Sequence, residues 1–418
     1  MQKNRWLGVD VNDLMESVHL DPSASGRVAI IGLGETDYGA DYRAARLKGP
    51  EYVAPDAESL ACRAFERALS DSGLQREDID GLCASFPYGG STPSSFAAAS
   101  QLKPGHTIPS GNEPWCGHGG MAPFVAAVEA VATGKCDVLA VVHCLPSKAV
   151  GRQYGGHTYS GGGRDSYYYY HPWGWSSQAA HWAMMYSYYQ AKFSVAESDL
   201  GAVALTLREN AMRNENATMR SPLSIDDYLS SRFIVRPIRL FDMCLVNDGA
   251  VCFILTSTGQ ATNLAHSPVI LAGWGNATVA HSKMHSMVRE RLSSQLGAAG
   301  AEALAMAGVT IADIDHFEGY DASSIHLINQ LEGYGFVEAG AGLEFWKDGN
   351  TAKGGRIPTN TGGGMLSGAY LQGWNLVAEV VRQLRHEAGP RQVGGAEVSM
   401  FSYAETDSAH PIVFTRHT

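Results

Sequence analysis

Three side chains in this sequence combine a reactive type with a position suited to chemistry: Cys116, Tyr320 and Tyr370. Cys116 stands in "WCGHGG", just before an apolar stretch that predicts a helix. A helix N-terminus lowers the pKa of a thiol and so favours the nucleophilic thiolate. Tyr370 lies near the start of a similar helix-like stretch, and Tyr320 follows a strand-like run ending in "HFEG". A phenol held at such a point can serve as a general acid or base.

Each of these residues also has a purely structural interpretation. A single cysteine in an apolar protein is usually a small core residue, and Tyr370 can simply pack at the start of its helix. A free tyrosine titrates near 10, so a tyrosine base needs hydrogen-bond donors or positive charge around it. Strand alternation predicts that the Asp321 carboxylate points away from the side that Tyr320 faces.

An internal repeat indicates which elements position these residues. The segments "ALSDSGLQREDID" (68–80) and "ALAMAGVTIADID" (303–315) align without a gap. Each predicts an amphipathic helix stopped by glycine, then a turn and an apolar strand. A strand-like segment precedes each copy, "RVAIIGLG" (27–34) and "PVILAGWG" (268–275).

A second pair of segments extends the repeat. "CGHGGMAPFVAAVEAVATG" (116–134) and "TGGGMLSGAYLQGWNLVAEVVRQLR" (361–385) each begin with glycines and continue as an apolar helix, followed by "DVLAVVHC" and "AEVSMFSYA". Each half therefore predicts strand–helix–strand–helix–strand and a mostly parallel sheet.

The domain organisation follows from these repeats. The first half comprises residues 28–144 plus 241–260, and the second comprises 265–418. Residues 145–240 form an inserted loop domain, rich in Gly, Tyr and Trp over 151–175, which we expect to lie over the site. Residues 1–27 read as an N-terminal extension.

Composition and missing motifs exclude several classes of function. A net charge of −11 disfavours nucleic-acid binding, and no apolar run reaches the length of a membrane span. The seven cysteines show no metal-ligand spacing and, without a secretion signal, indicate reduced thiols in the cytoplasm. In "GLGETD" (32–37), Asp37 stands where a nucleotide-binding GxGxxG motif has its third glycine. His118 is more often structural than a metal ligand, and no metal site is expected.

From about residue 28 the chain resembles the thiolase superfamily, in its sterol-carrier/lipid-transfer branch. The resemblance rests on "CLVNDGA" (244–250), "EGYDASS" (318–324) and "NTGGGMLSGAYLQG" (360–373). It implies the five-layered α-β-α-β-α thiolase fold, a dimer, and coenzyme A thioesters as substrates. Cys116 occupies the position of the family's nucleophile.

The departures from the family pattern indicate the reaction. Typical members of this branch have histidines where this chain has Tyr320 and Tyr370, and "SMFSYAE" lacks the second cysteine of degradative thiolases. A cysteine nucleophile needs an activating base, so acyl-enzyme chemistry is impaired. Two tyrosines in place of two histidines resemble thiolase-like aldolases that cleave steroid side chains as CoA thioesters.

The resemblance therefore implies retro-aldol cleavage of a β-hydroxyacyl-CoA, with one tyrosine as base and the other as acid; which is which stays open. Backbone N–H groups of Gly119, Gly120, Gly363 and Gly364 are expected to stabilise the enolate oxygen, and His118 to contact substrate. Coenzyme A enters as part of the substrate, with no covalently bound cofactor.

Related aldolases work with a small separate partner, an OB-fold chain with a zinc ribbon, so heterotetramers of two such pairs are expected. Two alternatives stay open: a thiolase or acyltransferase using Cys116, and a catalytically silent subunit that binds acyl-CoA.

Overall fold

The structure is a computed structural model that describes residues 22–110, 120–147, 177–261, 264, 266–278, 289–405 and 408–417. The predicted positions Cys116, His118 and Gly119 lie outside the described residues.

Two halves with the same order of elements make up most of the described chain. The first half contains β1 (Val28–Glu35), α2 (Ala57–Ser72), β2 (Gly81–Ser85), α4 (Ala122–Ala132), β4 (Val138–Pro146) and β7 (Asp248–Ser257). The second contains β8 (Val269–Trp274), α9 (Arg289–Ala307), β10 (His316–Gly319), α12 (Trp374–Leu384), β11 (Val398–Ala404) and β12 (Ser408–Arg416).

Equivalent residues of the sequence repeat perform equivalent local tasks. Gly73 and Gly308, which follow α2 and α9, have φ values of 73° and 69°, a conformation that glycine adopts without a steric penalty. The Asp80 carboxylate accepts hydrogen bonds from the N–H groups of residues 137 and 138, just where β4 begins. Asp315 does the same for residues 397 and 398 at the start of β11. In both halves the aspartate before β2 or β10 thus holds the start of the parallel strand that pairs beside it, β4 or β11.

The glycines of "GLG" and "GWG" bring each first strand against its helix. A Cβ on Gly34 would lie 1.9 Å from the carbonyl oxygen of Ala64 on α2, and one on Gly275 would lie 1.9 Å from that of Ala299 on α9. These glycines therefore permit close strand–helix packing, which agrees with rejecting a nucleotide-binding motif at residues 32–37.

The prediction of a mostly parallel sheet is wrong. Within the described residues, one sheet runs in the order β10-β11-β12-β8-β1-β7-β4-β2-β3, with β3 spanning His106–Thr107, and β9 (Ala277–Thr278) pairs with β12. Only the β10–β11, β2–β4 and β2–β3 pairs are parallel. The closing strands β7 and β12 run antiparallel to their neighbours. Only three residues separate β11 from β12, and so short a connection permits only an antiparallel pair.

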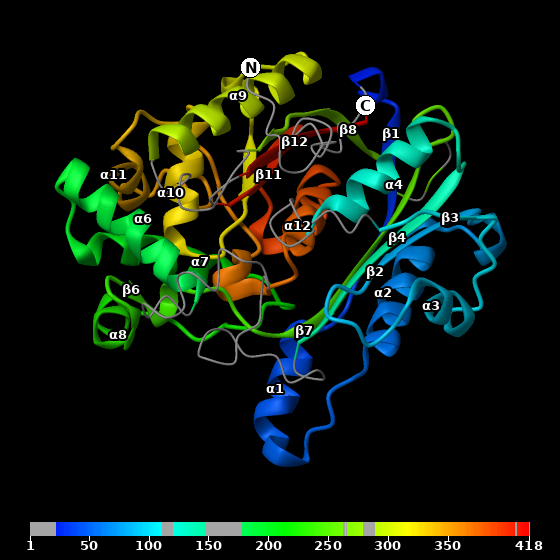
Figure 1. Cartoon of the computed structure of the whole chain (residues 1–418), viewed down its shortest axis with the longest axis horizontal. Helices are drawn as coiled ribbons and strands as arrows, with labels where there is room; N and C mark the ends of the chain where they lie inside the picture. Colours follow the sequence, from blue (N-terminus) through cyan, green and yellow to red (C-terminus); the bar gives the residue numbers. More distant parts are fainter. Residues whose placement is uncertain are drawn as a thin grey trace, which may run out of the picture.

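Helices cover both outer faces and fill the space between the halves. On the first half, α2 packs on β1, β7 and β4, and α3 (Pro93–Ala99) packs on β2. On the second, α9 packs on β8 and β12 and contacts α10 (Ser324–Gly333). Helix α4 packs on β2, β4 and β7, whereas α12 contacts β10 and β11 as well as β1 and β7. Figure 1 shows α12 at the centre of the molecule, in a middle layer between the strands of the two halves.

Trp374 anchors the start of α12 to the first half. Its indole stacks on His143, with ring centroids 4.8 Å apart and planes 8° from parallel. It also contacts Phe253 at 5.7 Å and Phe124 at 6.0 Å. The indole N–H donates to the carbonyl oxygen of Gly120 at 2.5 Å. The middle layer is therefore fixed at the helix end that lies next to the predicted site.

Part of the predicted inserted segment is described as short helices and a hairpin. It contains α6 (Gln178–Phe193), α7 (Gly201–Met212), α8 (Ile225–Ser230), β5 (Phe233–Val235) and β6 (Ile238–Arg239). The other helices are α1 (Tyr38–Lys48) and α11 (Gly342–Lys347), and a π-helical turn, η8, spans Gly364–Gly368. The domain boundaries at residues 27, 144 and 240 stay predictions.

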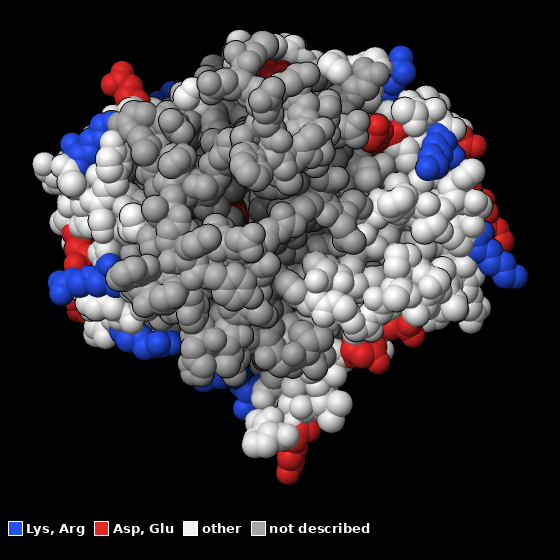
Figure 2. All heavy atoms as spheres, viewed as in Figure 1, with Lys and Arg blue, Asp and Glu red and all other residues white. Residues whose placement is uncertain are grey.

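The described surface carries both signs of charge. In Figure 2, Lys and Arg alternate with Asp and Glu around the rim of the visible face. The described part of this face shows no basic field of the kind that binds nucleic-acid phosphates. Among the helices described, none has the length and apolar character needed to cross a membrane.

Candidate functional site

Tyr320 projects from a firmly held point at the carboxyl end of β10. Its backbone N–H donates to the carbonyl oxygen of Ser402 at 2.8 Å, and its carbonyl oxygen accepts from the Gln330 side chain at 2.8 Å. The side chain is 1 % exposed. Because both backbone groups are bonded, the phenol starts from a fixed position next to β11.

Asp321 ties the Tyr320 segment to the glycine-rich loop. Its carboxylate accepts the N–H groups of Met365 at 2.9 Å and Leu366 at 3.2 Å, at the start of η8. A Cβ on Gly364 would lie 2.2 Å from an Asp321 oxygen, and Gly364 has a φ of 61°. Glycine is therefore required where the loop passes over the carboxylate. The prediction that Asp321 points away from the Tyr320 side agrees with this arrangement.

Residues 244–247 bridge the two tyrosine segments. The N–H of Cys244 donates to the carbonyl oxygen of Ala322 at 3.0 Å, and that of Leu245 to the carbonyl oxygen of Met365 at 3.0 Å. The N–H of Tyr370 donates to the side-chain oxygen of Asn247 at 2.7 Å. The stretch "CLVN" thus holds the backbone that carries Tyr320 and the backbone that carries Tyr370 in one frame.

The electrostatic environment keeps Tyr320 protonated. Burial raises the pKa of its phenol well above the ordinary value, and Tyr370, Tyr403, Glu405 and Cys244 raise the pKa further. Their contributions place these four groups within electrostatic reach of the Tyr320 hydroxyl. A phenol with so raised a pKa is neutral at physiological pH and can donate a hydrogen bond.

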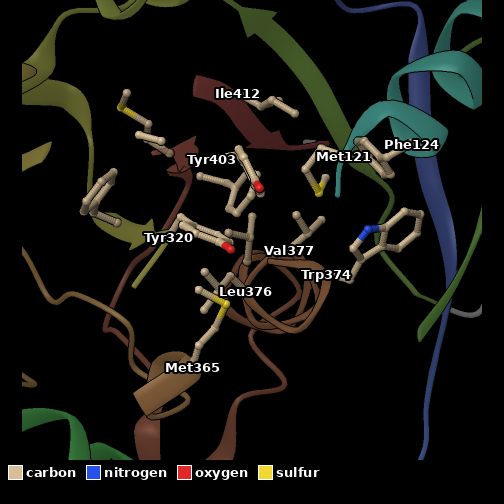
Figure 3. Packing of buried hydrophobic residues seen from close by; sticks show 14 of the residues in the cluster. Met121, Phe124, Tyr320, Met365, Trp374, Leu376, Val377, Tyr403 and Ile412 are labelled. Carbon is tan, nitrogen blue, oxygen red and sulfur yellow. The ribbon is translucent and has the colours of Figure 1, made fainter. Parts of the chain in front are cut away.

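Tyr403 and Cys244 are site neighbours that the sequence reasoning missed. The Tyr403 ring lies 4.3 Å from that of Tyr320, centroid to centroid, with an angle of 44° between the planes. Figure 3 shows both hydroxyls on the same side, toward Met121 at the start of α4. The signal that identifies Tyr320, a strand's carboxyl end, applies equally to Tyr403 near the end of the neighbouring β11.

The predicted binding glycines occupy different surroundings. A Cβ on Gly120 would lie 3.0 Å from Tyr403 and 3.1 Å from the carbonyl oxygen of Gln372, so Gly120 borders Tyr403. A Cβ on Gly363 would lie 2.6 Å from that of Ala211 on α7. The N–H of Gly363 donates to the carbonyl oxygen of Asn360 at 2.9 Å within the loop. The role of these glycines as donors to an enolate oxygen stays a prediction.

A separate polar cavity of about 430 Å³ lies on another side of the glycine-rich loop. Neither Tyr320 nor Tyr370 lines it. Its charged residues are largely paired: Arg382 with Glu35, and Arg391 with Glu379. Burial alone would raise the pKa of Glu379, but Arg391 and Arg382 beside it lower that pKa. Among the described residues, no group of three or more His, Cys, Asp or Glu side chains is arranged to hold a metal ion.

Comparison with known proteins places this geometry in a family. A sequence model of the thiolase C-terminal domain-like family matches residues 276–406. A Mycobacterium tuberculosis protein named 17-hydroxy-3-oxo-4-pregnene-20-carboxyl-CoA lyase is 33% identical over 86% of this chain and 92% of its own length. A steroid side-chain-cleaving aldolase of Thermomonospora curvata is 30% identical over 86% of this chain and 90% of its own length. An acetyl-CoA acetyltransferase of Methanothermobacter thermautotrophicus is 28% identical over 89% and 94%, respectively.

Solved structures agree with the sequence relatives. The structure of a protein named "Ltp2-ChsH2(DUF35) aldolase" superposes with a TM-score of 0.79 at 26% identity, covering 94% of this chain and 99% of that one. Human mitochondrial 3-ketoacyl-CoA thiolase in complex with CoA gives a TM-score of 0.66 at 14% identity over 94% of this chain and 99% of the thiolase, which shows the shared fold. The chain belongs to the thiolase superfamily, in the sterol-carrier-protein-2-thiolase-like branch that contains the steroid side-chain-cleaving aldolases.

Proposed function

We propose that this protein is a carbon–carbon lyase that cleaves a β-hydroxyacyl-CoA thioester by a retro-aldol reaction. The names of the two relatives at 30–33% identity, a CoA lyase and an aldolase, support this reaction class. Both names specify steroid substrates, so a steroid carrying the acyl-CoA side chain is the substrate class we propose.

In the proposed reaction Tyr370 acts as its phenolate, takes the proton of the β-hydroxyl and becomes a neutral phenol. The bond between Cα and Cβ breaks as the β-carbon becomes the carbonyl carbon of a ketone or aldehyde. The bonding electrons form the enolate of the shortened CoA thioester. Tyr320 then gives its proton to Cα and is left as the phenolate, and return of the proton from Tyr370 to Tyr320 restores the starting state. One proton is taken and one is given, so no external oxidant, reductant or covalent intermediate is needed.

The observation that carries this assignment is the burial of the Tyr320 phenol, which raises its pKa, with Tyr370 among the groups that raise that pKa further. A phenol with a raised pKa retains its proton until a strongly basic group forms next to it. A thioester enolate is such a group, whereas the β-hydroxyl of the substrate is not. Tyr320 therefore suits the acid role, which leaves the base role to Tyr370.

The test separates the two tyrosines by assaying two reactions. Cleavage is measured with a β-hydroxyacyl-CoA of a bulky 17-hydroxysteroid, and enolate formation as deuterium exchange at Cα of a saturated acyl-CoA product in D₂O. Tyr320→Phe should lose both reactions, and Tyr370→Phe should lose cleavage but retain exchange. Each loss should reach about 10²–10⁴-fold, the usual contribution of general acid–base catalysis. Retention of cleavage by Tyr320→Phe would refute the assignment.

The acyltransferase alternative keeps support from the acetyl-CoA acetyltransferase relative. It predicts that Cys116→Ala abolishes activity, whereas the aldolase proposal predicts that this variant retains cleavage. Alkylation with iodoacetamide does not decide the matter, because Cys244 also lies within electrostatic reach of Tyr320. Alkylation should therefore be compared in Cys116→Ala and Cys244→Ala variants. A silent acyl-CoA-binding subunit would show neither cleavage nor exchange.

We also propose a dimer that works with a separate small partner chain of OB-fold type. The name of the solved aldolase joins two components, Ltp2 and ChsH2(DUF35), which supports the separate partner chain. Co-expression with an encoded neighbour of that type should give a stable complex, and a failure to co-purify would count against it.

A further inference from the structure

Tyr403 stands between Tyr320 and the first half of the molecule. Its ring is fully buried and packs on the Tyr320 ring at 4.3 Å. It lies one residue after Ser402, whose carbonyl oxygen holds the Tyr320 N–H. The two phenols are thus fixed to each other through their rings and through the backbone of neighbouring parallel strands.

The ring of Tyr403 also packs against the backbone of Gly120 in the first half of the molecule. Gly120 approaches so closely that a Cβ there would lie 3.0 Å from Cε2 of Tyr403. The same Cβ would lie 3.1 Å from the carbonyl oxygen of Gln372, so an added methyl group would press on both residues. Gly120 is itself anchored by the Trp374 indole. Because the Tyr403 ring contacts both Gly120 and Tyr320, a shift of the Gly120 backbone would move the Tyr403 ring and, through it, the Tyr320 ring.

The far side of Tyr320 is closed by the start of α12. A Cβ on Gly373 would lie 3.7 Å from Cδ2 of Tyr320 and 3.2 Å from Phe401. Figure 3 shows Tyr320 between Tyr403 and the residues of α12, among them Leu376 and Val377. Removal of the Tyr403 ring opens one wall of this enclosure while leaving the other in place.

We propose that Tyr403 is a positioning residue, whose ring holds the Tyr320 phenol in its working orientation and couples it to Gly120. The inference rests on the proposed role of Tyr320. It assigns the task to the ring and not to the hydroxyl. Loss of the ring should impair turnover more than binding, because a phenol displaced by about 1 Å can cost about 100-fold in rate.

The test uses two substitutions at one position. Tyr403→Phe keeps the ring and should retain kcat within about threefold, while Tyr403→Leu should lower kcat by about 10–100-fold with KM nearly unchanged. Gly120→Ala should lower kcat about tenfold by displacing Tyr403. In the double variant Gly120→Ala with Tyr403→Leu, the fall should be no greater than with Tyr403→Leu alone, because the two substitutions act through one contact.

A matched control removes a different aromatic pair from the same half. Phe317 packs on Phe336 at 5.1 Å with an angle of 48°, a geometry close to that of Tyr403 on Tyr320. Phe317→Leu should lower the melting temperature about as much as Tyr403→Leu, yet leave kcat within about threefold.

Other results of these experiments would overturn the inference. Wild-type kcat in Tyr403→Leu, or multiplying effects of Gly120→Ala and Tyr403→Leu, would overturn the inference. Equal loss in Tyr403→Phe and Tyr403→Leu would overturn it too, because the hydroxyl would then be the active part. If Tyr320→Phe cleaves normally, the proposed function fails together with this inference. If Tyr320→Phe is inactive but Tyr403→Leu is normal, only this inference fails.

Discussion

Replacement of Asn247 by alanine should displace Tyr370 without touching its phenol. The Asn247 side-chain oxygen accepts the Tyr370 N–H at 2.7 Å, and Asn247 is 2 % exposed. Its amide nitrogen donates to the carbonyl oxygen of Asp248 at 3.2 Å, so the amide is oriented by its own backbone. Alanine removes the acceptor and leaves the N–H of Tyr370 buried.

The size of the effect follows from that one contact. A buried backbone N–H without a partner costs about 1–3 kcal/mol of folding stability. The chain relieves part of this cost by moving the N–H of Tyr370 toward water or another acceptor. A shift of about 1 Å in a reacting group can lower the rate about 100-fold. We therefore expect about 1–3 kcal/mol less stability, and a kcat reduced about 10–100-fold with KM little changed.

The neighbouring residue supplies a matched control. The N–H of Leu371 donates to the Asn375 side-chain oxygen at 3.3 Å, a longer and less buried bond of the same kind. Asn375→Ala should cost less than about 1 kcal/mol and leave cleavage near wild type. Urea denaturation and steady-state cleavage kinetics on both variants give the comparison. If Asn247→Ala loses stability but cleaves substrate normally, this bond does not set the working position of Tyr370.

Three further predictions concern pH and the glycine-rich loop. Because the pKa of Tyr320 is raised, deuterium exchange at Cα should accelerate about tenfold per pH unit up to at least pH 10; a plateau near pH 8 would contradict the raised pKa. Gly364→Ala should destabilise the fold by about 2–5 kcal/mol, because its φ is 61° and its Cβ would displace Asp321. Gly349 is the matched control, because its φ is 77° but a Cβ there would meet open space. Gly349→Ala should lower the free energy of unfolding by only about 1–2 kcal/mol in the same denaturation experiment. Equal losses in the Gly364 and Gly349 variants would exclude the clash with Asp321. Burial lowers the pKa of His326 to about 4. The stability contributed by the neutral His326 side chain is therefore fully present above pH 6.5. It falls by about 3 kcal/mol as the pH drops toward 4, because the unfolded chain takes up a proton first. His326→Gln should reduce the slope of the free energy of unfolding against pH over that interval by the equivalent of about one proton. Superimposable profiles of the variant and the wild type would refute this.

The sequence alone determined the local features of this architecture. The repeated helix–glycine–turn units predict their own helices, stops and following strands, because each of these signals acts on residues a few positions away. Gly73 and Gly308 need left-handed backbone, which is a local requirement, whereas Asp80 and Asp315 accept N–H groups that lie 57 and 82 residues farther along the chain, at the starts of β4 and β11. The position of Tyr320 at the end of a strand follows from the same local pattern.

Only the tertiary structure decided how the halves combine and which groups surround the phenols. The antiparallel closing strands depend on pairing between distant segments, which periodicity does not encode. Tyr403, Cys244 and Asn247 reach Tyr320 or Tyr370 from residues far away in the chain. Whether Tyr320 holds its proton depends on burial and on those neighbours, and neither exists until the chain is folded. The sequence therefore identifies two candidate phenols, and the fold supplies the burial and the neighbours that raise the pKa of Tyr320.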